Sequence, residues 1–597
     1  MRAATRVRAG VGISRRGPYL WDNPASAATD PSTVSAVQAP ARPSTSERIL
    51  PKPPSKATDW GCAHGAAPAL AIAEAARRHG ELVLAVTASV QEAATLEADL
   101  AFFLGDDLPV HHFPDWETLP YDLFSPHQDI VSQRLRTLDW LPRARGGVLV
   151  VPVATLLQRV VPRDYLAAHV LDLDVGDRPG IEGLRERLAR GGYRHVSQVR
   201  EHGEYAVRGA LVDLFPMGRD EPLRVDFFDD EIETIRTFDP ETQISREHVD
   251  GVHMLPAREF PLTEAGITHF RRRFREAFDA ESRNSPVYRD VSNGIAPAGL
   301  EYYLPLFFDE LATLFDYLPD ATRPFLLDGC LDAARQFRDQ VEHRHEERRH
   351  DRERPILPPD RLYLDPEALR ERLEAKPVVR VHAYEQTGDH AWNLPTALPP
   401  RLPMQPRADN PLAELDRHLE QAGGRVLFTA ESAGRRESLF ETLWHHGIRC
   451  EQVTGWTAFL AGEAPYAITA TPLSAGLVVA PGGPEIITEQ QLLGDRARQQ
   501  RRRRRQTRDA DTVVSNLAEL DIGSPVVHVD HGVGRYRGLA TLSVGPVEQE
   551  FLTLEYAGND KLYVPVSNLH LISRYTGADP EHAPQHRLGG EQWQKVR

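Results

Sequence analysis

The chain has 597 residues, which is too long for one hydrophobic core and predicts about three to five domains. It carries 86 acidic side chains against 70 Lys and Arg, for a net charge of −16, which excludes a uniformly basic nucleic-acid coat. Cys62, Cys330 and Cys450 form no CxxC pair, which disfavours a disulfide framework or a zinc site and favours a reducing compartment. No apolar run is long enough to cross a membrane, and we expect a cytoplasmic protein without membrane contact.

Residues 1–52 differ in composition from the remainder of the chain. Five arginines precede the first acidic residue, Asp22, and a stretch rich in Ser, Thr, Pro and Ala follows. An arginine-rich, acid-poor start is compatible with an organelle transit peptide, a disordered tail or an extended start of translation. Of these, we expect a disordered N-terminal extension.

An α/β domain is predicted to begin near Trp60. A glycine-containing turn leads into an alanine-rich helix at 60–80, and apolar strands at 82–87 and 147–153 flank a second helix at 90–104. Alternating helices and short apolar strands indicate a parallel sheet.

The turn at 61–69 lacks the residues that a nucleotide-binding loop uses. Such a loop cradles phosphates with backbone N–H groups and ends in a Lys and a Ser or Thr, whereas Pro68 and Ala69 stand at these places beyond Gly65. Without the lysine no cation meets the phosphates, and without the hydroxyl magnesium loses a ligand. No GxxxxGK[ST] motif occurs in the chain. We therefore expect no cofactor, no metal site and no catalytic residue here.

A predicted hairpin carries a candidate binding surface. Strand 204–215 has Arg208 in its middle, and a turn-rich segment joins it to strand 223–228. Alternation puts Arg224 and Phe228 on the face opposite the apolar one, so the hairpin would bring all three side chains to one sheet surface. An arginine beside an exposed aromatic is typical of an interface. A salt-bridged surface with Phe228 partly covered fits equally well.

The central segments carry weaker signals. Residues 223–233 look like a magnesium-binding strand that ends in an acidic pair, but without a phosphate loop a solvated strand end is the better interpretation. Residues 263–278 predict an amphipathic helix with a basic face, and 343–354 a polar helix or hinge. A Pro-rich linker at 394–411 leads to another strand–helix unit at 424–448, to which we assign no catalytic role.

A run of five arginines precedes the C-terminal module: Arg501, Arg502, Arg503, Arg504 and Arg505. Such a run contacts DNA or RNA phosphates, or it forms the solvated face of a tethering helix. Because basic runs are common, we favour the tether. The two interpretations are compatible.

Residues 523–577 predict a small all-β module. In one of its strands Leu552, Leu554 and Tyr556 point to one side, with alternate residues on the other. A Gly-Asn-Asp sequence at 558–560 suits a hairpin turn. Five short strands with little helix make a small barrel without room for a catalytic cleft. The module is therefore expected to bind a partner.

These segments resemble one bacterial family, the transcription-repair coupling factors (Mfd). The C-terminal module is similar to the family's RNA-polymerase-interacting domain, a CarD-like, SH3-like small β-barrel. GGYRHVSQVREHGEYAVRGALVDLFPMG (191–218) resembles the UvrA-binding domain that the family shares with UvrB, and PDWETLPYDLFSPHQDIVSQRLRTL (114–138) resembles its UvrB-like front half. In UvrB the latter region carries a longer aromatic hairpin that engages damaged DNA. Here it is shortened, and we expect most of its aromatic residues to pack under a loop.

The resemblance also implies which residues contact partners. The family's UvrA contacts fall on Arg208, Arg224 and Phe228. An apolar contact with the RNA polymerase β subunit falls on Leu542, in strand 538–544; a buried Leu542 is the alternative.

The implied fold is an α/β multidomain chain: a degenerate helicase-type UvrB-like α/β domain with an inserted α+β UvrA-binding domain, a small α/β domain and the terminal barrel. The expected parts are a disordered extension (1–52), the first part of the UvrB-like domain (53–165), the UvrA-binding domain (166–256), the second UvrB-like part (257–390), the small α/β domain (391–487), an Arg-rich linker helix (488–516), the polymerase-interacting barrel (517–580) and the start of a connecting helix (581–597).

The resemblance implies a role in transcription-coupled nucleotide excision repair. The barrel would hold stalled RNA polymerase while the UvrA-binding domain recruits UvrA. In full-length members an ATP- and magnesium-dependent DNA translocase follows the barrel and makes most of the DNA contact. We expect this chain to lack that motor, to be a monomer and to have no activity of its own. The alternative is a UvrB-like ATP-dependent helicase active in its own right; a nuclease or metalloenzyme has no supporting cluster.

Overall fold

The computed structural model describes most of the chain, and the described residues belong to one compact unit within Thr45–Arg597. Nearly all of the predicted extension 1–52 lies outside the described residues. These are 50–279, 284–405, 408, 410–421, 423–480, 482–493, 523–528, 531–544, 547–558, 560–565 and 572–574, with the side chains of 541–550, 565 and 572–574 not described.

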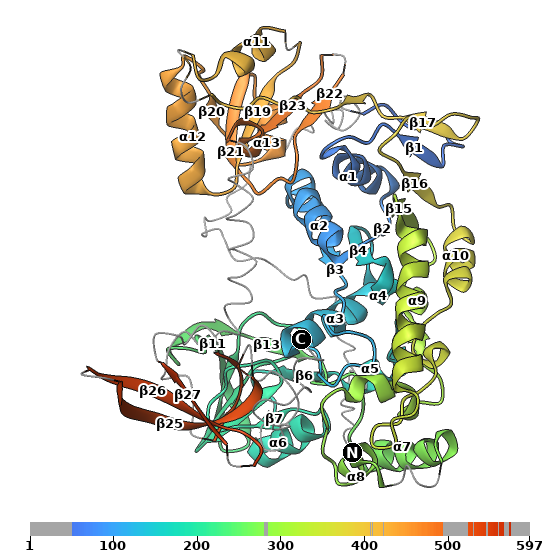
Figure 1. Ribbon diagram of the computed structural model, residues 1–597, viewed down its shortest axis with the longest axis vertical. Helices are drawn as coiled ribbons and strands as arrows, with labels where there is room; N and C mark the ends of the chain where they lie inside the picture. The colour runs from blue at the N-terminus through green and yellow to red at the C-terminus, as the bar shows by residue number, and fades with distance from the viewer. Residues whose placement is uncertain are drawn as a thin grey trace, which may run out of the picture. The chain divides into compact units, whose positions relative to one another are not determined.

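A parallel seven-stranded sheet forms the first domain, as the alternating pattern predicts (Figure 1). Its order is β17-β1-β16-β15-β2-β4-β3, and every pairing in it is parallel. It combines segments from both sides of an inserted domain, and its last strand lies just beyond the expected boundary at 390. The strands are β1 Asp59–Gly61, β2 Val83–Thr87, β3 Val110–His112, β4 Val148–Pro152, β15 Arg323–Leu327, β16 Val379–Val381 and β17 Ala391–Asn393.

Capping residues mark the start of one helix around this sheet and the end of another. The helix α2 (Val90–Leu104) starts at Ser89, whose hydroxyl accepts a hydrogen bond from the Glu92 N–H at 3.2 Å. The helix α1 (Ala67–His79) ends at Gly80, whose φ of 72° suits a glycine. The others are α3 Gln128–Trp140, α4 Val153–Leu157, α5 Arg163–His169, α7 Glu264–Ala277, α8 Pro286–Ser292, α9 Cys330–Arg348 and α10 Pro366–Glu374.

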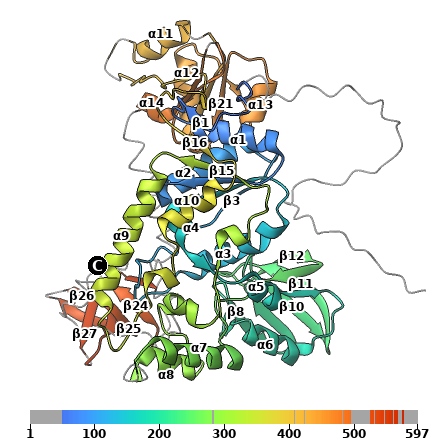
Figure 2. The same cartoon turned by 90° about the vertical axis from the view of Figure 1, so that its right-hand side faces the viewer.

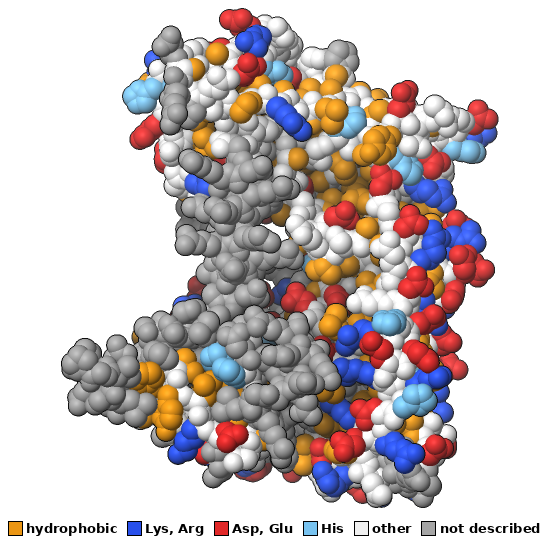
Figure 3. All heavy atoms as spheres, in the orientation of Figure 1, with side chains coloured by type: hydrophobic (Ala, Val, Ile, Leu, Met, Phe, Trp, Pro, Cys, Tyr) orange, Lys and Arg blue, Asp and Glu red, His pale blue; other side chains and the backbone are white. Residues whose placement is uncertain are grey.

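Of the two helical predictions in the second part of this domain, the first is confirmed and the second is confirmed in part. The amphipathic helix predicted at 263–278 is α7, which buries Phe270 and Phe274. The polar helix or hinge predicted at 343–354 is helical only over 343–348, the last part of α9, which ends at Arg348. Figure 3 shows basic and acidic side chains interspersed over α9 and α10, and they form ion pairs such as Arg338–Glu342 at 2.6 Å. This face therefore lacks the single-sign basic patch typical of nucleic-acid binding.

The inserted domain is built on a six-stranded sheet of order β12-β11-β10-β9-β8-β7 (Figure 2). One strand was predicted over 204–215, but the structure divides it into two strands at Gly209, whose φ of 63° permits a tight turn. The helix α6 (Gly180–Arg190) buries Leu184 and Leu188 in the core that covers one sheet face. The strands are β7 Arg194–His195, β8 Glu204–Arg208, β9 Leu211–Leu214, β10 Leu223–Phe228, β11 Glu231–Phe238 and β12 Ser245–Val249, with β6 Leu171–Asp174 paired to β13 Gly251–Met254.

A third sheet has the order β18-β22-β23-β19-β21-β20. The strand–helix unit predicted at 424–448 is β19 (Val426–Ala430) followed by α12 (Ala433–His445). The remaining elements are β18 Thr396–Ala397, α11 Ala413–Gln421, β20 Glu451–Gln452, α13 Trp456–Ala461, β21 Tyr466–Ala470, β22 Leu477–Val479, β23 Glu485–Thr488 and α14 Glu489–Leu493.

The C-terminal module contains the five predicted strands, all antiparallel, in the order β27-β26-β25-β24-β28. Its core includes Leu552, Leu554 and Tyr556, which share the face predicted from their alternation. The strands are β24 Pro525–His528, β25 Gly532–Val544, β26 Val547–Glu555, β27 Lys561–Pro565 and β28 Ile572–Arg574. No helix in the described part of the chain is long and apolar enough to span a membrane.

Candidate partner-binding surfaces

Arg208, Arg224 and Phe228 project from one face of the six-stranded sheet. Burial alternates along β10, so Arg224 and Phe228 lie on the face opposite the core. The pairing of β8 with β9, and of β9 with β10, places Arg208 in line with Leu211 and Asp226. The structure therefore brings the three predicted residues onto one sheet surface.

Arg224 is held by a carboxylate within its own sheet. Its Nε and Nη2 donate to the carboxylate oxygens of Asp213 at 2.7 and 3.0 Å, and its Nη1 donates to the Gln243 carbonyl and to Ser245 Oγ at 3.3 and 3.1 Å. The hydrogen bonds to Asp213, which is buried, raise the pKa of Arg224. The guanidinium also lies 5.0 Å from the Phe238 ring centroid. Of the two interpretations drawn from the sequence, the salt-bridged surface describes Arg224.

Phe228 and Arg208 are arranged differently. Phe228 is 74% exposed, which is unusual for a large aromatic side chain. Arg208 is exposed, donates to the Ser197 carbonyl at 3.1 Å and forms no ion pair within the described residues. An exposed aromatic ring on the same sheet face as a guanidinium without a carboxylate partner is the composition of an interface.

Sequence reasoning missed Asp213 as the partner of Arg224. The available signal was an acidic residue inside the otherwise apolar strand LVDL. Asp213 pairs in register with Arg224 across β9 and β10, and that register follows from the turn between the two strands.

The C-terminal module presents apolar side chains at its surface. Leu539, in β25, is 47% exposed, and Tyr563, in β27, is 43% exposed. Leu542, the predicted polymerase contact, lies in β25, where its backbone is paired in register with Gln549. The side chain of Leu542 is among those not described, so its predicted role stays a prediction.

The turn that would cradle phosphates is filled by the protein's own carbonyl groups. The N–H of Ala63 donates to the His382 carbonyl at 3.0 Å, and the N–H of Ala66 donates to the Gly476 carbonyl at 3.1 Å. A Cβ atom on Gly65 would lie 2.0 Å from the Gly476 oxygen. A carbonyl of the third sheet's domain therefore lies against this turn, at the start of α1, where a phosphate oxygen would be expected.

Neighbouring contacts hold Gly476 in that place. The N–H of Ser474 donates to Asp99 Oδ1 at 2.9 Å, and its hydroxyl donates to the other oxygen of the same carboxylate. The rings of Phe103 and Trp456 meet edge to face at 5.3 Å. A nucleotide-binding loop would end in a Lys and a Ser or Thr, and Pro68 and Ala69 stand at these two places. Pro68 has no N–H group to donate, and Ala69 is buried in α1.

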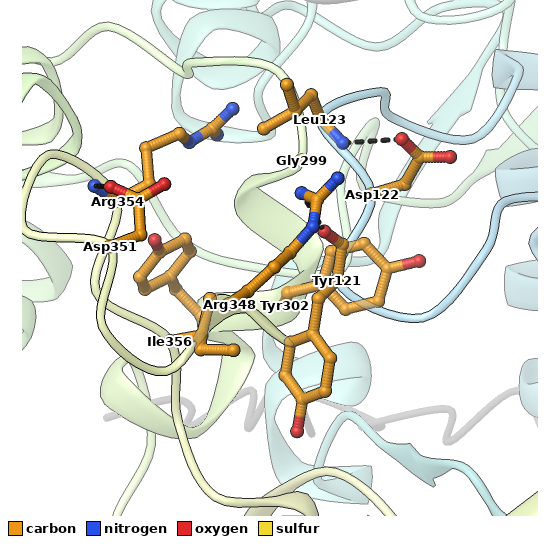
Figure 4. Close-up of a pocket in the computed structure, with 10 residues that line it drawn as sticks. Tyr121, Asp122, Leu123, Gly299, Tyr302, Arg348, Asp351, Arg354 and Ile356 are labelled. Atoms are coloured by element: carbon orange, nitrogen blue, oxygen red, sulfur yellow. Dashed lines mark hydrogen bonds between the residues drawn. The ribbon is translucent and has the colours of Figure 1, made fainter. Parts of the chain in front are cut away.

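The segment at 113–127 contains no strand. Trp116 and Tyr121 are buried, as predicted for most of its aromatic residues. Figure 4 shows Tyr121 beside Tyr302 in the wall of a pocket that Arg348 also lines. The Tyr121 hydroxyl donates to the Leu357 carbonyl at 2.9 Å, and Arg348 Nη1 donates to the Tyr121 carbonyl at 2.8 Å. These bonds fix the segment against the domain instead of letting it project.

No group of three or more His, Cys, Asp or Glu side chains among the described residues could hold a metal ion. Burial raises the pKa of Cys330 and of Cys450 to about 12, so neither thiol ionises readily at neutral pH.

Comparison with known proteins finds similarity to one family along most of the chain. The model of the UvrB interaction domain matches residues 171–260, that of the MFD D3 domain matches 418–492, and that of the CarD-like/TRCF RID domain matches 520–576. Transcription-repair-coupling factors of Haemophilus influenzae and Escherichia coli are each 44% identical over 535 residues, 89% of this chain. That of Myxococcus xanthus is 31% identical over 565 residues, 87% of this chain.

The chain belongs to the transcription-repair coupling factor family. It spans about half the length of these relatives, 46% in each case.

The two candidate partner-binding surfaces fall within matches to coupling-factor domains, whereas the phosphate turn at 61–69 lies outside them. The UvrB interaction match contains Arg208 and Phe228, and the CarD-like match contains Leu542. The D3 match contains Gly476, whose carbonyl fills the phosphate turn. Arg501 to Arg505 lie between the D3 and CarD-like matches and outside the described residues, so their predicted tether or phosphate-binding role stays a prediction.

Proposed function

We propose that this chain is the partner-recognising part of a transcription-coupled nucleotide excision repair factor. It binds the RNA polymerase β subunit through the C-terminal module and UvrA through the inserted domain. The observation that carries the proposal is the exposed Phe228 on the same sheet face as Arg208, in a sheet that matches the UvrB interaction domain.

The chemistry of this face suits a protein partner. A large exposed aromatic loses water-exposed apolar area when it enters a pocket, and such residues dominate interface energies. Arg208 supplies a cation for an acidic group beside that pocket. Arg224 is committed to Asp213, so its contribution to UvrA binding is through the shape of the surface.

The C-terminal module supplies the second attachment. Exposed Tyr563 lies in the same antiparallel sheet as Leu542, which supports an apolar contact with polymerase. Leu539 pairs in register with the core residue Leu552 and so lies on the sheet face opposite to Tyr563. Joining two binding modules in one chain raises the effective concentration of one partner near the other. That is the physical basis for recruiting UvrA to a stalled polymerase.

Nucleotide chemistry is not proposed for the described domains. The phosphate turn lacks the lysine and the hydroxyl, and the carbonyl of Gly476 lies against its N–H groups. No observation favours the alternative of a helicase that is active in its own right.

The test uses the 597-residue chain, purified UvrA and purified RNA polymerase in two separate binding titrations. Phe228→Ala is expected to weaken UvrA binding by about tenfold or more while leaving polymerase binding unchanged. Leu542→Arg is expected to do the reverse. Leu398→Ala, at a side chain that is also 74% exposed but lies outside both matched domains, is the control. Unchanged UvrA binding by a folded Phe228→Ala protein would refute the assignment of this surface.

A further inference from the structure

A loop of the inserted domain displays an apolar side chain that the sequence did not single out. The loop joins β11 to β12 and carries Ile244, which is 65% exposed. Scattered exposed leucines or isoleucines are ordinary. The backbone around Ile244 is unusual because so many hydrogen bonds fix it.

The loop is fixed from within. The Asp239 carboxylate accepts hydrogen bonds from the N–H groups of Glu241 and Thr242 at 2.9 and 3.0 Å. The N–H of Gln243 donates to the Asp239 carbonyl at 2.7 Å, and the N–H of Asp239 donates to the Ile244 carbonyl at 3.0 Å. Gln243 adopts a φ of 61°, in the left-handed region that residues other than glycine rarely occupy. The strained residue immediately precedes the exposed one.

Arg224 fixes the loop from the sheet. Two of its nitrogens are bound by Asp213, and the third donates to the Gln243 carbonyl and to Ser245 Oγ. These two acceptors flank Ile244 on either side. Arg224 therefore connects a buried carboxylate of the sheet to the residues that present Ile244.

This arrangement extends the surface that carries Phe228. Arg224 and Phe228 are four residues apart on one face of β10, which corresponds to about 13 Å along a strand. Ile244 lies near Arg224, because Gln243 and Ser245, on either side of Ile244, are both hydrogen-bonded to Arg224. The two exposed apolar side chains are thus displayed by one sheet.

Two further arginines near this surface are paired within the domain. Arg246 pairs with Asp239 and Glu221 at 2.5 and 3.1 Å, and Arg236 lies 4.0 Å from Asp226. Paired charges contribute little attraction for a partner. The matching partner surface is therefore apolar at two points, with an acidic group opposite Arg208.

We propose that Ile244 is a second apolar contact for the partner bound through Phe228, and that Arg224 acts as a positioning residue for the 239–245 loop. The inference rests on the proposed UvrA-binding function and specifies its surface. In place of a direct ion pair with the partner, Arg224 contributes the geometry of the loop.

The first experiment titrates UvrA against the full chain and its Ile244→Ser variant. Ile244→Ser is expected to weaken UvrA binding by about tenfold. Leu398 is also an exposed aliphatic side chain but lies outside the inserted domain. Leu398→Ser is therefore expected to leave the affinity for UvrA within about twofold of the parent value. If Phe228→Ala weakens binding and Ile244→Ser does not, the inference is wrong while the proposed function stands. If the unmodified chain does not bind UvrA, both are wrong.

The second experiment separates positioning from direct contact with a double-mutant cycle. Arg224→Lys keeps the positive charge but loses the planar fork that reaches Asp213 and the loop together. It is expected to weaken UvrA binding by about tenfold in the parent chain and by less than about twofold in the Ile244→Ser chain. Additive losses would overturn the positioning role.

Ser245→Ala provides a milder version of the same cycle. It removes one bond between Arg224 and the loop while leaving the pair with Asp213 intact. It is expected to weaken UvrA binding in the parent chain and to have no further effect in the Ile244→Ser chain. Equal losses in both chains would contradict the inference even if Arg224→Lys fails to fold.

Discussion

Arg134 and Glu259 form a fully buried ion pair, with Arg134 Nε 3.1 Å from Glu259 Oε1. The other carboxylate oxygen of Glu259 accepts from Trp116 Nε1 at 3.0 Å, and Arg134 also donates to the Pro114 carbonyl and to Gln158 Oε1 at 2.7 and 3.2 Å. Glu259 lies where the chain leaves the inserted domain, between β13 and α7. The pair thus ties that exit to α3.

Removing Arg134 should be severe, because it would leave the Glu259 carboxylate buried without a cation. Arg134→Ala is expected to lower the free energy of unfolding by about 3–5 kcal/mol, measured by guanidinium denaturation. Arg136 lies on the same helix as Arg134 and forms an exposed ion pair with Asp220, which is outside that helix. Arg136→Ala breaks this pair and should lower the free energy of unfolding by less than about 1 kcal/mol. An equal decrease in the free energy of unfolding for the two variants would show that the buried ion pair stabilises the fold no more than the exposed one.

The filled phosphate turn predicts that added nucleotide leaves the chain unaffected. A ligand at a hundred times its Kd would stabilise the fold by about 2.7 kcal/mol, so millimolar MgATP should produce no shift in Tm. The same result is expected for a variant carrying Pro68→Lys and Ala69→Ser, because the N–H groups of the turn still donate to carbonyls. Calorimetric ATP binding by this variant would show that the missing side chains were the sole obstacle.

Glu301 predicts a pH dependence of stability. Burial raises the pKa of its carboxyl group to about 7, above its unfolded value of about 4.3. The folded state therefore binds the proton more tightly, and this stabilisation is present below pH ~4 and is lost as the pH rises through about 7. Glu301→Gln keeps an acceptor for the Ser125 hydroxyl and should flatten the fall in unfolding free energy between about pH 4 and 7.

The measurement for Glu301 is chemical denaturation at a series of pH values. Glu74, whose pKa burial also raises to about 7, is present in both proteins and cancels in the difference. Parallel curves for the parent and Glu301→Gln would contradict the raised pKa.

Gly534 should tolerate no side chain. A Cβ atom there would lie 3.0 Å from two ring carbons of Tyr556, a core residue whose hydroxyl donates to the Gly532 carbonyl at 3.3 Å. Gly534→Val is expected to destabilise the C-terminal module by about 1–3 kcal/mol and to speed its cleavage by trypsin. Leu539→Ala, at an exposed position of the same strand, should leave the cleavage rate unchanged; faster cleavage of both would point to a module without a fixed core.

Local pattern was sufficient for much of the fold. The buried runs at 82–87 and 147–153 became parallel strands β2 and β4, and the alternation around Leu552 and Leu554 separated core from surface in β26. The placement of Arg224 and Phe228 on one face of β10 also followed from alternation, whereas Arg208 joins that face through the pairing of β8, β9 and β10. The features that follow from alternation depend on residues close together in sequence, and the period of two is a property of the strand itself.

Two features of the candidate site required the tertiary structure. Arg224 appeared equivalent to Arg208 in the sequence, but the register of β9 against β10 places Asp213 opposite Arg224.

The sequence shows that the phosphate turn lacks the Lys and the Ser or Thr of a nucleotide-binding loop. That the Gly476 carbonyl lies against this turn depends on a residue about four hundred positions away.

The sequence by itself thus determined which side chains of a strand share one face. The tertiary structure decided which outward charges are already satisfied, because hydrogen-bond partners are set by strand register and domain packing.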